Sequence, residues 1–337
     1  MGGDTRHFAT LLEDLRANPD YQVTLVNTSR GDDHYSALHN LRVALRTFTA
    51  LALHAWRVDI ISFHASDRGL LYFAPLVALF GRLFGKRRIL RVFGGSFGDY
   101  FAASSPRRRD WLRRFVLGAD VILLQTQRMV GQLQGEGRGR LEWFSTYIRQ
   151  APPPADFRRG ENCARFIFLG HLWRTKGIET LLAAAPRLPE GTTIDIYGPQ
   201  DEYTGAAVDA RGAGRVRYRG FLSHADVNRK LWEYDCLVLP TFHEGEGYPG
   251  VIAEAFAHGL PVISTRWLAI PEIVDDSCGV LIEPEDVDAF VAAVSSLHAD
   301  APRWLRLCDG AHARASQFDH RVWARKFETL CEAGRAG

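Results

Sequence analysis

The chain has 337 residues, a length that is typical of two domains rather than of one ordinary core. Hydrophobic residues make up 46% of the sequence and charged residues 24%, which excludes a largely disordered chain. The net charge of +2 conceals an asymmetry, because residues 1–155 hold 21 basic and 13 acidic residues whereas residues 156–337 hold 20 and 26. Opposite charges on the two halves predict two domains that face different partners.

The first half alternates between helical and strand patterns. Helical periodicity covers 5–17, 35–56, 69–84 and 106–117, and strand patterns cover 21–26, 58–63, 88–93 and 120–124. This alternation predicts a parallel sheet that is covered on both faces. A domain of this kind normally opens with a strand, whereas this chain opens with Gly2, Gly3 and a helix. We therefore expect that the first strand is missing or that the true start lies upstream.

The second half restarts the alternation after a stiff spacer that contains Pro152, Pro153 and Pro154. Strand patterns cover 165–169, 193–197, 216–218, 236–239, 262–264 and 279–282, and helical patterns cover 177–188, 225–233, 249–258, 286–297 and 302–332. The sequence thus predicts an N-terminal Rossmann-like domain at 1–155, a C-terminal one at 156–315, and a final helix at 316–337 that packs back toward the first. Two doubly wound α/β domains would place a ligand in the cleft between them.

The spacing of the cysteines and the hydropathy of the chain indicate the cellular compartment of the protein. The five cysteines are scattered without metal-ligand spacing, as is typical of buried thiols in a reducing cytosol. No secretory signal pattern precedes the first helix, and the longest apolar run, at 70–81, is too short to cross a bilayer. We expect a cytoplasmic protein.

The densest chemical signal follows the predicted strand at 236–239, where an acidic, glycine-rich loop leads into a helix that starts near Pro249. Free N–H groups at a helix N-terminus suit a pyrophosphate, and Gly250 and Val251 are the expected donors because proline has none. Glu254 follows about one turn later, and Glu246 lies in the loop before the helix. Carboxylates at these places are suited to accept hydrogen bonds from sugar hydroxyls.

The segment EGYPGVIAEAFAHGLPVI at 246–263 resembles the retaining glycosyltransferases of the GT-B fold, specifically the GT4 group. The Glu-x7-Glu spacing of Glu246 and Glu254 carries the resemblance. It implies that Glu246 contacts donor-sugar hydroxyls, that Glu254 contacts the nucleotide ribose, and that Tyr248 belongs to the donor site. The resemblance extends over about 164–297.

A second signal is a loop with cations between a strand and a helix, at 170–176. Lys176 is a compact charge suited to a diphosphate, and it matches the Lys-Gly of the family pattern. His171 stands where that pattern has arginine, and Arg174 would supply the missing charge. Lys176 and Glu246 are therefore the expected catalytic residues, with His171 and Arg174 in the donor site.

In the first half the resemblance is weaker. Gly2 and Gly3 resemble the loop near the donor phosphates, and Gly94 and Gly95 resemble a rim of the cleft on the acceptor side. The pocket histidine of the family is absent there, and His64 at the end of the preceding strand is the candidate neighbour. Asp286 and Asp288 form a DxD, which we interpret as a helix start rather than a metal site.

One segment has the pattern of a basic helix on an anionic membrane, because arginines alternate with Trp111, Leu112 and Phe115. The arginines are Arg107, Arg108, Arg109, Arg113 and Arg114. A solvated face of an arginine-rich protein is the alternative. The chain has no stacking array or recognition motif for nucleic acid, so we expect none as a partner.

These observations together predict a metal-independent retaining hexosyltransferase, cytoplasmic or peripheral on the inner face of the membrane. It would move sugar from a UDP- or GDP-sugar to a glycan or lipid-linked acceptor, in cell-surface polysaccharide or glycolipid synthesis, without a further cofactor. Two alternatives stay open. One is another GT-B activity on nucleotide sugars, such as an epimerase or hydrolase, and the other is a non-catalytic partner protein that keeps the fold.

Overall fold

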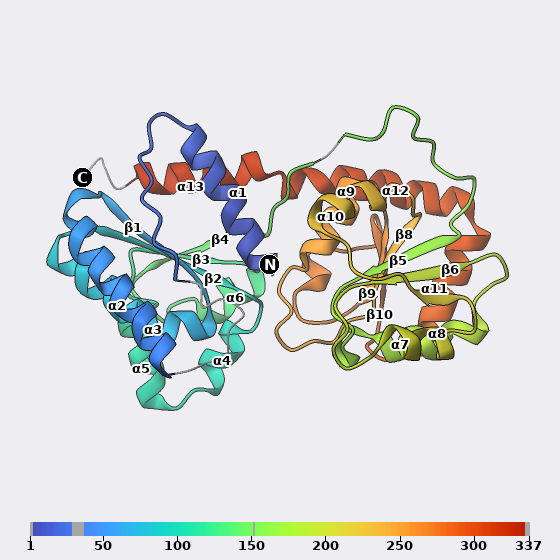
Figure 1. The fold of residues 1–337 in the computed structure, drawn as a ribbon, viewed down its shortest axis with the longest axis horizontal. Coiled ribbons are helices and arrows are strands. Elements are labelled where there is room, and N and C mark those ends of the chain that lie inside the picture. Colours follow the sequence, from blue (N-terminus) through green and yellow to red (C-terminus); the bar gives the residue numbers. More distant parts are fainter. Residues whose placement is uncertain (1–2, 29–36, 151, 334–337) are drawn as a thin grey trace. The chain divides into compact units, whose positions relative to one another are not determined.

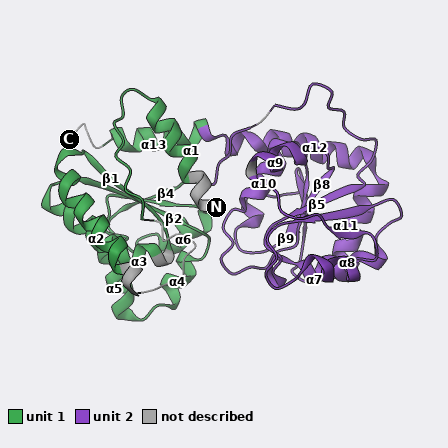
Figure 2. Cartoon of the chain, viewed as in Figure 1, with its two compact units in different colours: residues 1–145, 321–337 green, residues 146–320 purple. Residues whose placement is uncertain are grey.

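The computed structural model describes residues 3–28, 37–150 and 152–333. The chain divides into two compact units, which Figure 2 shows in two colours: unit 1 comprises 1–145 and 321–337, and unit 2 comprises 146–320. The expected boundaries after 155 and 315 both lie within unit 2. The final helix lies in unit 1.

Unit 1 is built on a four-stranded parallel sheet with the order β1-β2-β3-β4. Its strands are β1 (Ile60–Ser66), β2 (Arg87–Phe93), β3 (Val121–Leu124) and β4 (Arg140–Trp143). Its helices are α1 (Gly3–Ala17), α2 (Ala37–His54), the short η1 (Ala55–Arg57), α3 (Asp67–Leu83), α4 (Phe97–Ala103), α5 (Pro106–Phe115), α6 (Gln127–Leu133) and α13 (His320–Glu332).

Strand alternation assigns the two faces of this sheet to different helices. Phe63 and Leu90 point into the core that α3 covers, whereas His64 and Arg91, one residue further along paired strands, point to the other face. On that face the ring of His64 lies 5.8 Å from the ring of Phe327 in α13. Figure 1 shows α1 and α13 on one side of the sheet and α2, α3 and α5 on the other.

The helix α13 is anchored to β4, the strand at the edge of this sheet. The ring of Trp323 packs edge-on at 5.0 Å from the ring of Trp143. The ammonium group of Lys326 donates to the carbonyl oxygen of Trp143 at 2.7 Å and pairs with Glu142 at 3.0 Å. The last helix therefore completes the core of unit 1.

Two expectations for secondary structure were wrong, and three elements of unit 1 were missed. Residues 21–26 form no strand, because among the described residues β1 is paired only with β2, so nothing satisfies their backbone groups in a ladder. The helix expected over 302–332 is interrupted, since Asp319 is extended after η5 (Ser316–Phe318). The strand β4 and the short helices α4 and α6 were not predicted.

Unit 2 is built on a six-stranded parallel sheet with the order β10-β9-β8-β5-β6-β7. Its strands are β5 (Arg165–Leu169), β6 (Thr193–Tyr197), β7 (Val216–Tyr218), β8 (Cys236–Leu239), β9 (Val262–Thr265) and β10 (Gly279–Ile282), each at a place where a strand was expected. Its helices are α7 (Ile178–Ala184), α8 (Gly205–Arg211), α9 (His224–Leu231), α10 (Gly250–Ala257), α11 (Val287–Ala299) and α12 (Ala301–Ala315), with short turns η2 (Arg174–Lys176), η3 (Ala185–Arg187) and η4 (Ile270–Glu272). Of these helices α8 was not predicted.

The four central strands of unit 2, β5, β6, β8 and β9, are buried on both faces, as the apolar runs of the sequence predict. Figure 1 shows α9, α10 and α12 on one face of this sheet and α7, α8 and α11 on the other. Among the described residues, no helix of either unit is both long enough and apolar enough to cross a membrane.

Candidate functional site

The strand order of unit 2 creates one position where the connections that leave two adjacent strands run to opposite faces of the sheet. β5 pairs with β6 on one side and with β8 on the other, so the connections that leave β5 and β8 run to opposite faces of the sheet. Ligands of open α/β sheets bind beyond the carboxyl ends of the strands at such a switch point. The loops 170–177 and 240–249 follow β5 and β8 and meet there.

These two loops are joined by an ion pair between the two expected catalytic side chains. The ammonium nitrogen Nζ of Lys176 lies 2.6 Å from Oε2 of Glu246, and the two side chains are only 14% and 9% exposed. An ammonium has three N–H donors, so Lys176 retains donors for a second anion. The pair brings together residues 70 positions apart in sequence.

Thr241 supports this ion pair from the end of β8. Its hydroxyl lies 2.9 Å from the same Oε2 of Glu246 and 3.2 Å from the carbonyl oxygen of Thr175, and the residue is fully buried. A hydroxyl has one hydrogen to donate, and the carboxylate is the stronger acceptor. Thr241 therefore holds the carboxylate of Glu246 in place.

Gly177 allows the two loops to approach closely. Its φ is +89°, in the left-handed region, and a Cβ at this position would lie 2.2 Å from the carbonyl oxygen of Pro240. Both facts require glycine. The residue directly after Lys176 therefore fixes how near that lysine comes to the loop after β8.

Aromatic side chains line the same pair of loops. The ring of Trp173 stacks on His171 with centroids 4.4 Å apart and lies 5.2 Å from the ring of His243. His243 in turn lies 3.1 Å from the hydroxyl of Thr175, and its carbonyl oxygen accepts from the indole of Trp267 at 2.8 Å. Burial, and then the positive charge of Lys176, lower the pKa of His243, so this imidazole is neutral at pH 7.

Helix α10 begins where the sequence predicted an anion site. Gly250 is its first residue, after Pro249, and the first N–H groups of a helix have no partner within the helix. Glu254 is buried within α10, and the hydroxyl of the buried Tyr248 donates to the carboxylate of Glu272. Val251 follows Gly250 in the first turn.

The other two predicted diphosphate contacts of the first loop, His171 and Arg174, are each close to a carboxylate. Nδ1 of His171 lies 2.7 Å from Asp201. The guanidinium group of Arg174 lies 2.8 Å from Glu285, and the side chain is 61% exposed. Their roles as diphosphate contacts stay predictions, and in this structure Lys176 is the better placed cation because it is buried at the switch point.

In unit 1 the predicted residues Gly94 and Gly95 follow the carboxyl end of β2. Gly94 has a φ of +91° and its N–H donates to the side-chain oxygen of Gln125 at 3.0 Å. Gly95 continues this bend before α4. Gly3 begins α1, and Gly2 lies outside the described residues.

The candidate neighbour His64 lies at the carboxyl end of β1, among aromatic rings. Its Nε2 lies 2.8 Å from the hydroxyl of Ser62, and its Nδ1 is buried without a hydrogen-bond partner among the described residues. Burial and the adjacent guanidinium of Arg91 lower the pKa of His64 to about 3. The guanidinium of Arg91 lies 4.7 Å from the centre of the ring of the neighbouring Phe93.

The DxD has the geometry of a helix start. Oδ1 of Asp286 accepts from the N–H of Ala289 at 2.8 Å, which is an N-cap of α11. Asp288 pairs with Arg187 at 2.6 Å. Each carboxylate thus has a local structural contact.

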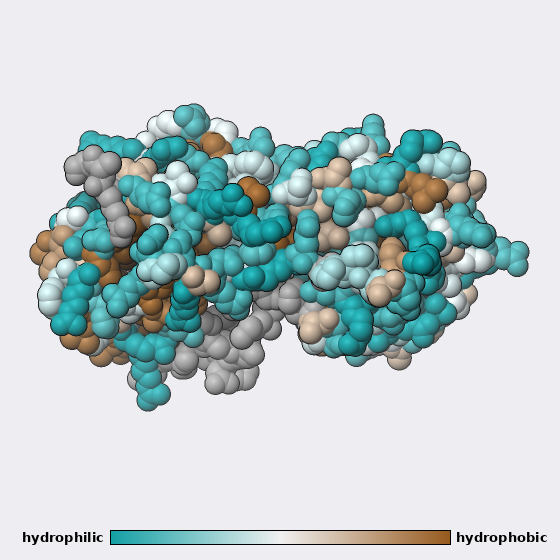
Figure 3. Space-filling model, turned by 90° about the horizontal axis from the view of Figure 1, so that it is seen from above, coloured by the Kyte–Doolittle hydropathy of each residue, from teal (hydrophilic) through white to brown (hydrophobic). Residues whose placement is uncertain are grey.

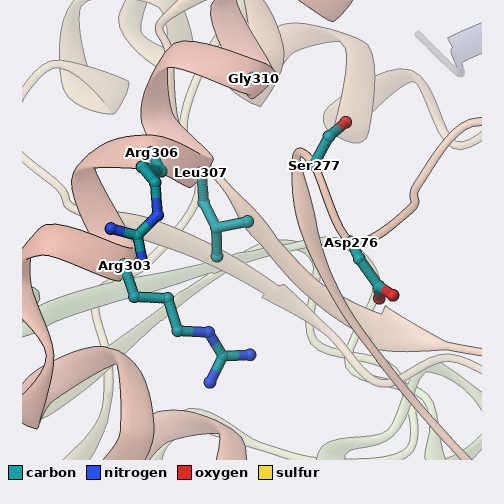
Figure 4. A pocket seen from close by; sticks show the side chains of 6 residues that line it. All are labelled: Asp276, Ser277, Arg303, Arg306, Leu307 and Gly310. Atoms are coloured by element: carbon teal, nitrogen blue, oxygen red, sulfur yellow. The ribbon is translucent and has the colours of Figure 1, made fainter.

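A surface hollow of about 660 Å³ lies elsewhere in unit 2. Figure 4 shows Arg303, Arg306 and Leu307 on α12 facing it, with Asp276 and Ser277 on the opposite side. None of the predicted site residues lines this hollow.

Sequence reasoning missed the supporting residues of the site, namely Thr175, Thr241, His243 and Trp173. Thr241 and His243 follow a correctly predicted strand, so their position after its carboxyl end was an available signal. Trp173 lies in the loop at 170–176, for which the sequence argument considered only the charged side chains.

Comparisons with known proteins agree with this geometry. Residues 163–300 match the family model of glycosyl transferases group 1. The chain is 27% identical over 313 residues to glycogen synthase of Mycobacterium tuberculosis, covering 88% of this chain and 74% of that protein. Sucrose-phosphate synthase of Thermosynechococcus elongatus superposes with a TM-score of 0.78 at 17% identity over 99% of this chain and 94% of that one. HepE of Anabaena in complex with UDP superposes with a TM-score of 0.71 at 17% identity, covering 89% and 84%.

The two parallel α/β units thus define a GT-B fold. Residues 163–300 belong to the glycosyl transferases group 1, and the similarities along the chain support a glycosyltransferase of the GT4 type.

Proposed function

We propose that the protein is a retaining glycosyltransferase that moves a hexose from a UDP- or GDP-sugar to a glycan or lipid-linked acceptor. The buried ion pair between Lys176 and Glu246, held at the switch point by Thr241, is the observation that carries this proposal. Unit 2 binds the donor and unit 1 presents the acceptor. The complex of HepE with UDP supports a nucleotide-linked donor.

The leaving diphosphate gains negative charge as the bond to the sugar breaks. Lys176 and the first N–H groups of α10, at Gly250 and Val251, supply fixed positive charge to it from a partly buried position. Such preorganised charge stabilises a transition state more than it stabilises the ground state. Arg174 adds positive charge and His171 a hydrogen-bonding imidazole at the edge of the site when the donor displaces their present carboxylate contacts.

Glu246 orients the donor sugar. Within the described part of the chain both contacts to its carboxylate go to Oε2, so Oε1 accepts from a sugar hydroxyl. Glu254 accepts from the ribose, and Tyr248 closes the loop against Glu272. The buried environment strengthens these hydrogen bonds.

Transfer needs neither an enzyme nucleophile nor a divalent cation in this proposal. The attacking hydroxyl approaches the face from which the diphosphate leaves, and the diphosphate accepts its proton. In this proposal Gly94, Gly95 and His64 belong to the acceptor side. The charges that a cation would supply come from Lys176 and α10.

The protein acts in the cytoplasm on cell-surface polysaccharide or glycolipid, at the inner face of the membrane. The excess of basic residues in 1–155 supports contact with an anionic surface. In α5, Arg107, Arg108 and Arg114 contribute to this charge. Arg109 adds to it, while Arg113 is engaged by Glu136 at 2.6 Å and by Asp110 at 3.0 Å.

Calorimetry with UDP, GDP and their hexose conjugates tests donor binding directly. Lys176→Ala should abolish binding of the nucleoside diphosphates and Glu246→Gln should weaken binding of the sugar conjugate only. Lys230→Ala is the matched control, because this lysine of unit 2 pairs with the neighbouring Glu233 at 2.7 Å and is none of the predicted site residues. Absence of nucleotide binding by the wild-type chain would favour a non-catalytic partner protein.

Product analysis separates transfer from the alternative reactions. Nucleotide release that is independent of any acceptor would indicate a hydrolase, and an altered sugar on the nucleotide would indicate an epimerase. Proton NMR of the fresh product reports the anomeric configuration, and an inverted anomer would refute retention. Loss of turnover with EDTA, restored by a divalent cation, would refute the metal-independent mechanism.

A further inference from the structure

Hydrophobic side chains on the surface are concentrated in one part of unit 1. Eight of the twelve exposed large hydrophobic residues in the described chain lie between Leu41 and Leu83. They are Leu41, Leu45, Phe48, Leu53, Trp56, Tyr72, Leu79 and Leu83. Figure 3 shows brown, hydrophobic side chains gathered on the surface of this unit. Single exposed apolar residues are ordinary, whereas a cluster of this size marks an interaction surface.

These residues form regular stripes on two helices. On α2, Leu41, Leu45 and Phe48 recur at intervals of four and three residues, opposite the buried Val43 and Thr47. On α3, Tyr72, Leu79 and Leu83 follow the same helical face. Each helix thus has one apolar face toward the core and a second one toward solvent. Leu45 is 62% exposed and Leu83 is 66% exposed.

The two stripes belong to neighbouring helices. α2 packs on α3, and the ring of Phe48 meets that of Phe80 edge-on with centroids 5.3 Å apart. Phe48 is itself half exposed, so the contact between the helices lies at the border of the exposed stripe. We call the exposed residues of α2, η1 and α3 together the α2–α3 face.

The charge around the α2–α3 face is strongly positive. Residues 37–88 contain seven arginines and one lysine but only two acidic residues, Asp59 and Asp67. Arg42, Arg57 and Arg82 are exposed, and the guanidinium of Arg57 lies 4.4 Å above the ring of the exposed Trp56. An apolar stripe flanked by cations is the pattern of a helix that lies at the surface of an anionic bilayer.

The arginine-rich helix α5 has the charge but lacks such an apolar surface. Its aromatic residues Trp111 and Phe115 pack against the core of unit 1. Leu112 is fully buried. α5 therefore offers electrostatic attraction without residues that could enter the acyl region.

We propose that the α2–α3 face is the membrane-docking surface of this protein, and that its occupant is a bilayer rich in anionic phospholipid. Leucine, phenylalanine and tryptophan side chains enter the interface between headgroups and acyl chains, while arginines contact lipid phosphates. A second copy of the chain fits this face less well, because two such faces brought together would oppose their excess positive charges. The proposal does not depend on the transfer chemistry.

Vesicle flotation of the full chain without donor tests this assignment. Vesicles contain phosphatidylcholine alone or with phosphatidylglycerol. The wild-type chain should float with the anionic vesicles, and the combined variant Leu45→Gln, Leu79→Gln and Leu83→Gln should lose about tenfold or more in affinity. The matched control is Leu305→Gln, an exposed leucine on α12 of unit 2 that is 43% exposed, and it should bind like the wild type.

A second variant separates charge from insertion. Arg42→Gln with Arg82→Gln should weaken binding and make it less dependent on salt, since fewer cations face the headgroups. Far-ultraviolet circular dichroism checks that each variant is folded. The proposal is wrong if the folded leucine variant still binds anionic vesicles like the wild type. It is equally wrong if that variant converts a dimer in light scattering to a monomer and vesicle binding is absent, because the face then belongs to a second copy.

Discussion

Substitution of Gly177 by alanine should damage both the stability of unit 2 and its candidate site. The position has a φ of +89°, and the new Cβ would lie 2.2 Å from the carbonyl oxygen of Pro240. The left-handed backbone costs an alanine about 1–2 kcal/mol. The overlap with a backbone oxygen adds about 1–3 kcal/mol, because the strand end cannot rotate away as a side chain could.

Gly191 is the matched control for this substitution. It lies in the same unit with a φ of +82°, but nothing lies within 4 Å of a Cβ added there. Gly191→Ala should therefore cost only the backbone term, about 1–2 kcal/mol, whereas Gly177→Ala should cost about 2–5 kcal/mol in the free energy of unfolding. Lys176 is the preceding residue, so Gly177→Ala alone should also weaken nucleotide binding.

Urea unfolding followed by tryptophan fluorescence measures the two costs, and calorimetry with UDP and GDP measures binding. Equal losses of stability in the two variants would refute the argument from close approach, since the backbone strain is shared. If Gly177→Ala is destabilised but binds nucleotide like the wild type, the close approach of the two loops is not needed for nucleotide binding.

Two further predictions concern individual side chains. Thr241→Val should lower the turnover of transfer by about tenfold or more, because a hydrogen bond to a buried carboxylate is worth about 1.5–3 kcal/mol. Thr241→Ser keeps the hydroxyl and should retain most of the turnover. Equal turnover of the valine and serine variants would contradict the positioning role of Thr241. His64→Phe should remove part of the acid sensitivity of unit 1. Since the pKa of His64 falls to about 3 in the folded chain, its imidazole is neutral in both states above about pH 6.5, and below that pH the unfolded chain alone takes up the proton. As the pH falls from about 6.5 to about 3, the free energy of unfolding of the wild type should decrease by up to about 1.4 kcal/mol per pH unit relative to that of the variant. Urea unfolding at a series of pH values measures this difference. If the free energies of unfolding of the two proteins change in parallel with pH, His64 does not contribute to the acid sensitivity.

The second half of the sequence predicted its fold closely because its four central strands are buried on both faces. Continuous apolar runs such as 236–239 have few alternatives to a central parallel strand. The alternation at 21–26 looked similar, but an isolated apolar alternation does not supply the neighbouring strand that a ladder requires. β4 was missed for the opposite reason, because Arg140 and Glu142 make an edge strand look like a polar loop.

The candidate site was predictable where charged residues stand within a short sequence motif. Lys176 and Glu246 were named from two separate loops, and the structure brings them to 2.6 Å. The contact itself depends on strand order, which local patterns do not encode. Thr241 could not be singled out for the same reason, since its importance comes from the carboxylate that the fold delivers to it.

The exposed stripes of α2 and α3 show a limit of periodicity as evidence. Leu41, Leu45 and Phe48 recur at helical spacing and support the helix predicted at 35–56, but this spacing does not tell which side of the helix is buried. The structure places Val43 and Thr47 inward. The packing of α2 against the neighbouring helix α3 decides which of its two apolar faces is buried in the core.

The return of the chain into unit 1 sets an order for its synthesis. Unit 2 is continuous from 146 to 320, whereas unit 1 is split between 1–145 and 321–337. A growing chain can therefore complete unit 2 while β4 still lacks the helix that supplies Trp323 and Lys326. The N-terminal unit is made first but finishes last, and until α13 emerges its sheet keeps an incompletely covered face that nascent-chain chaperones would encounter.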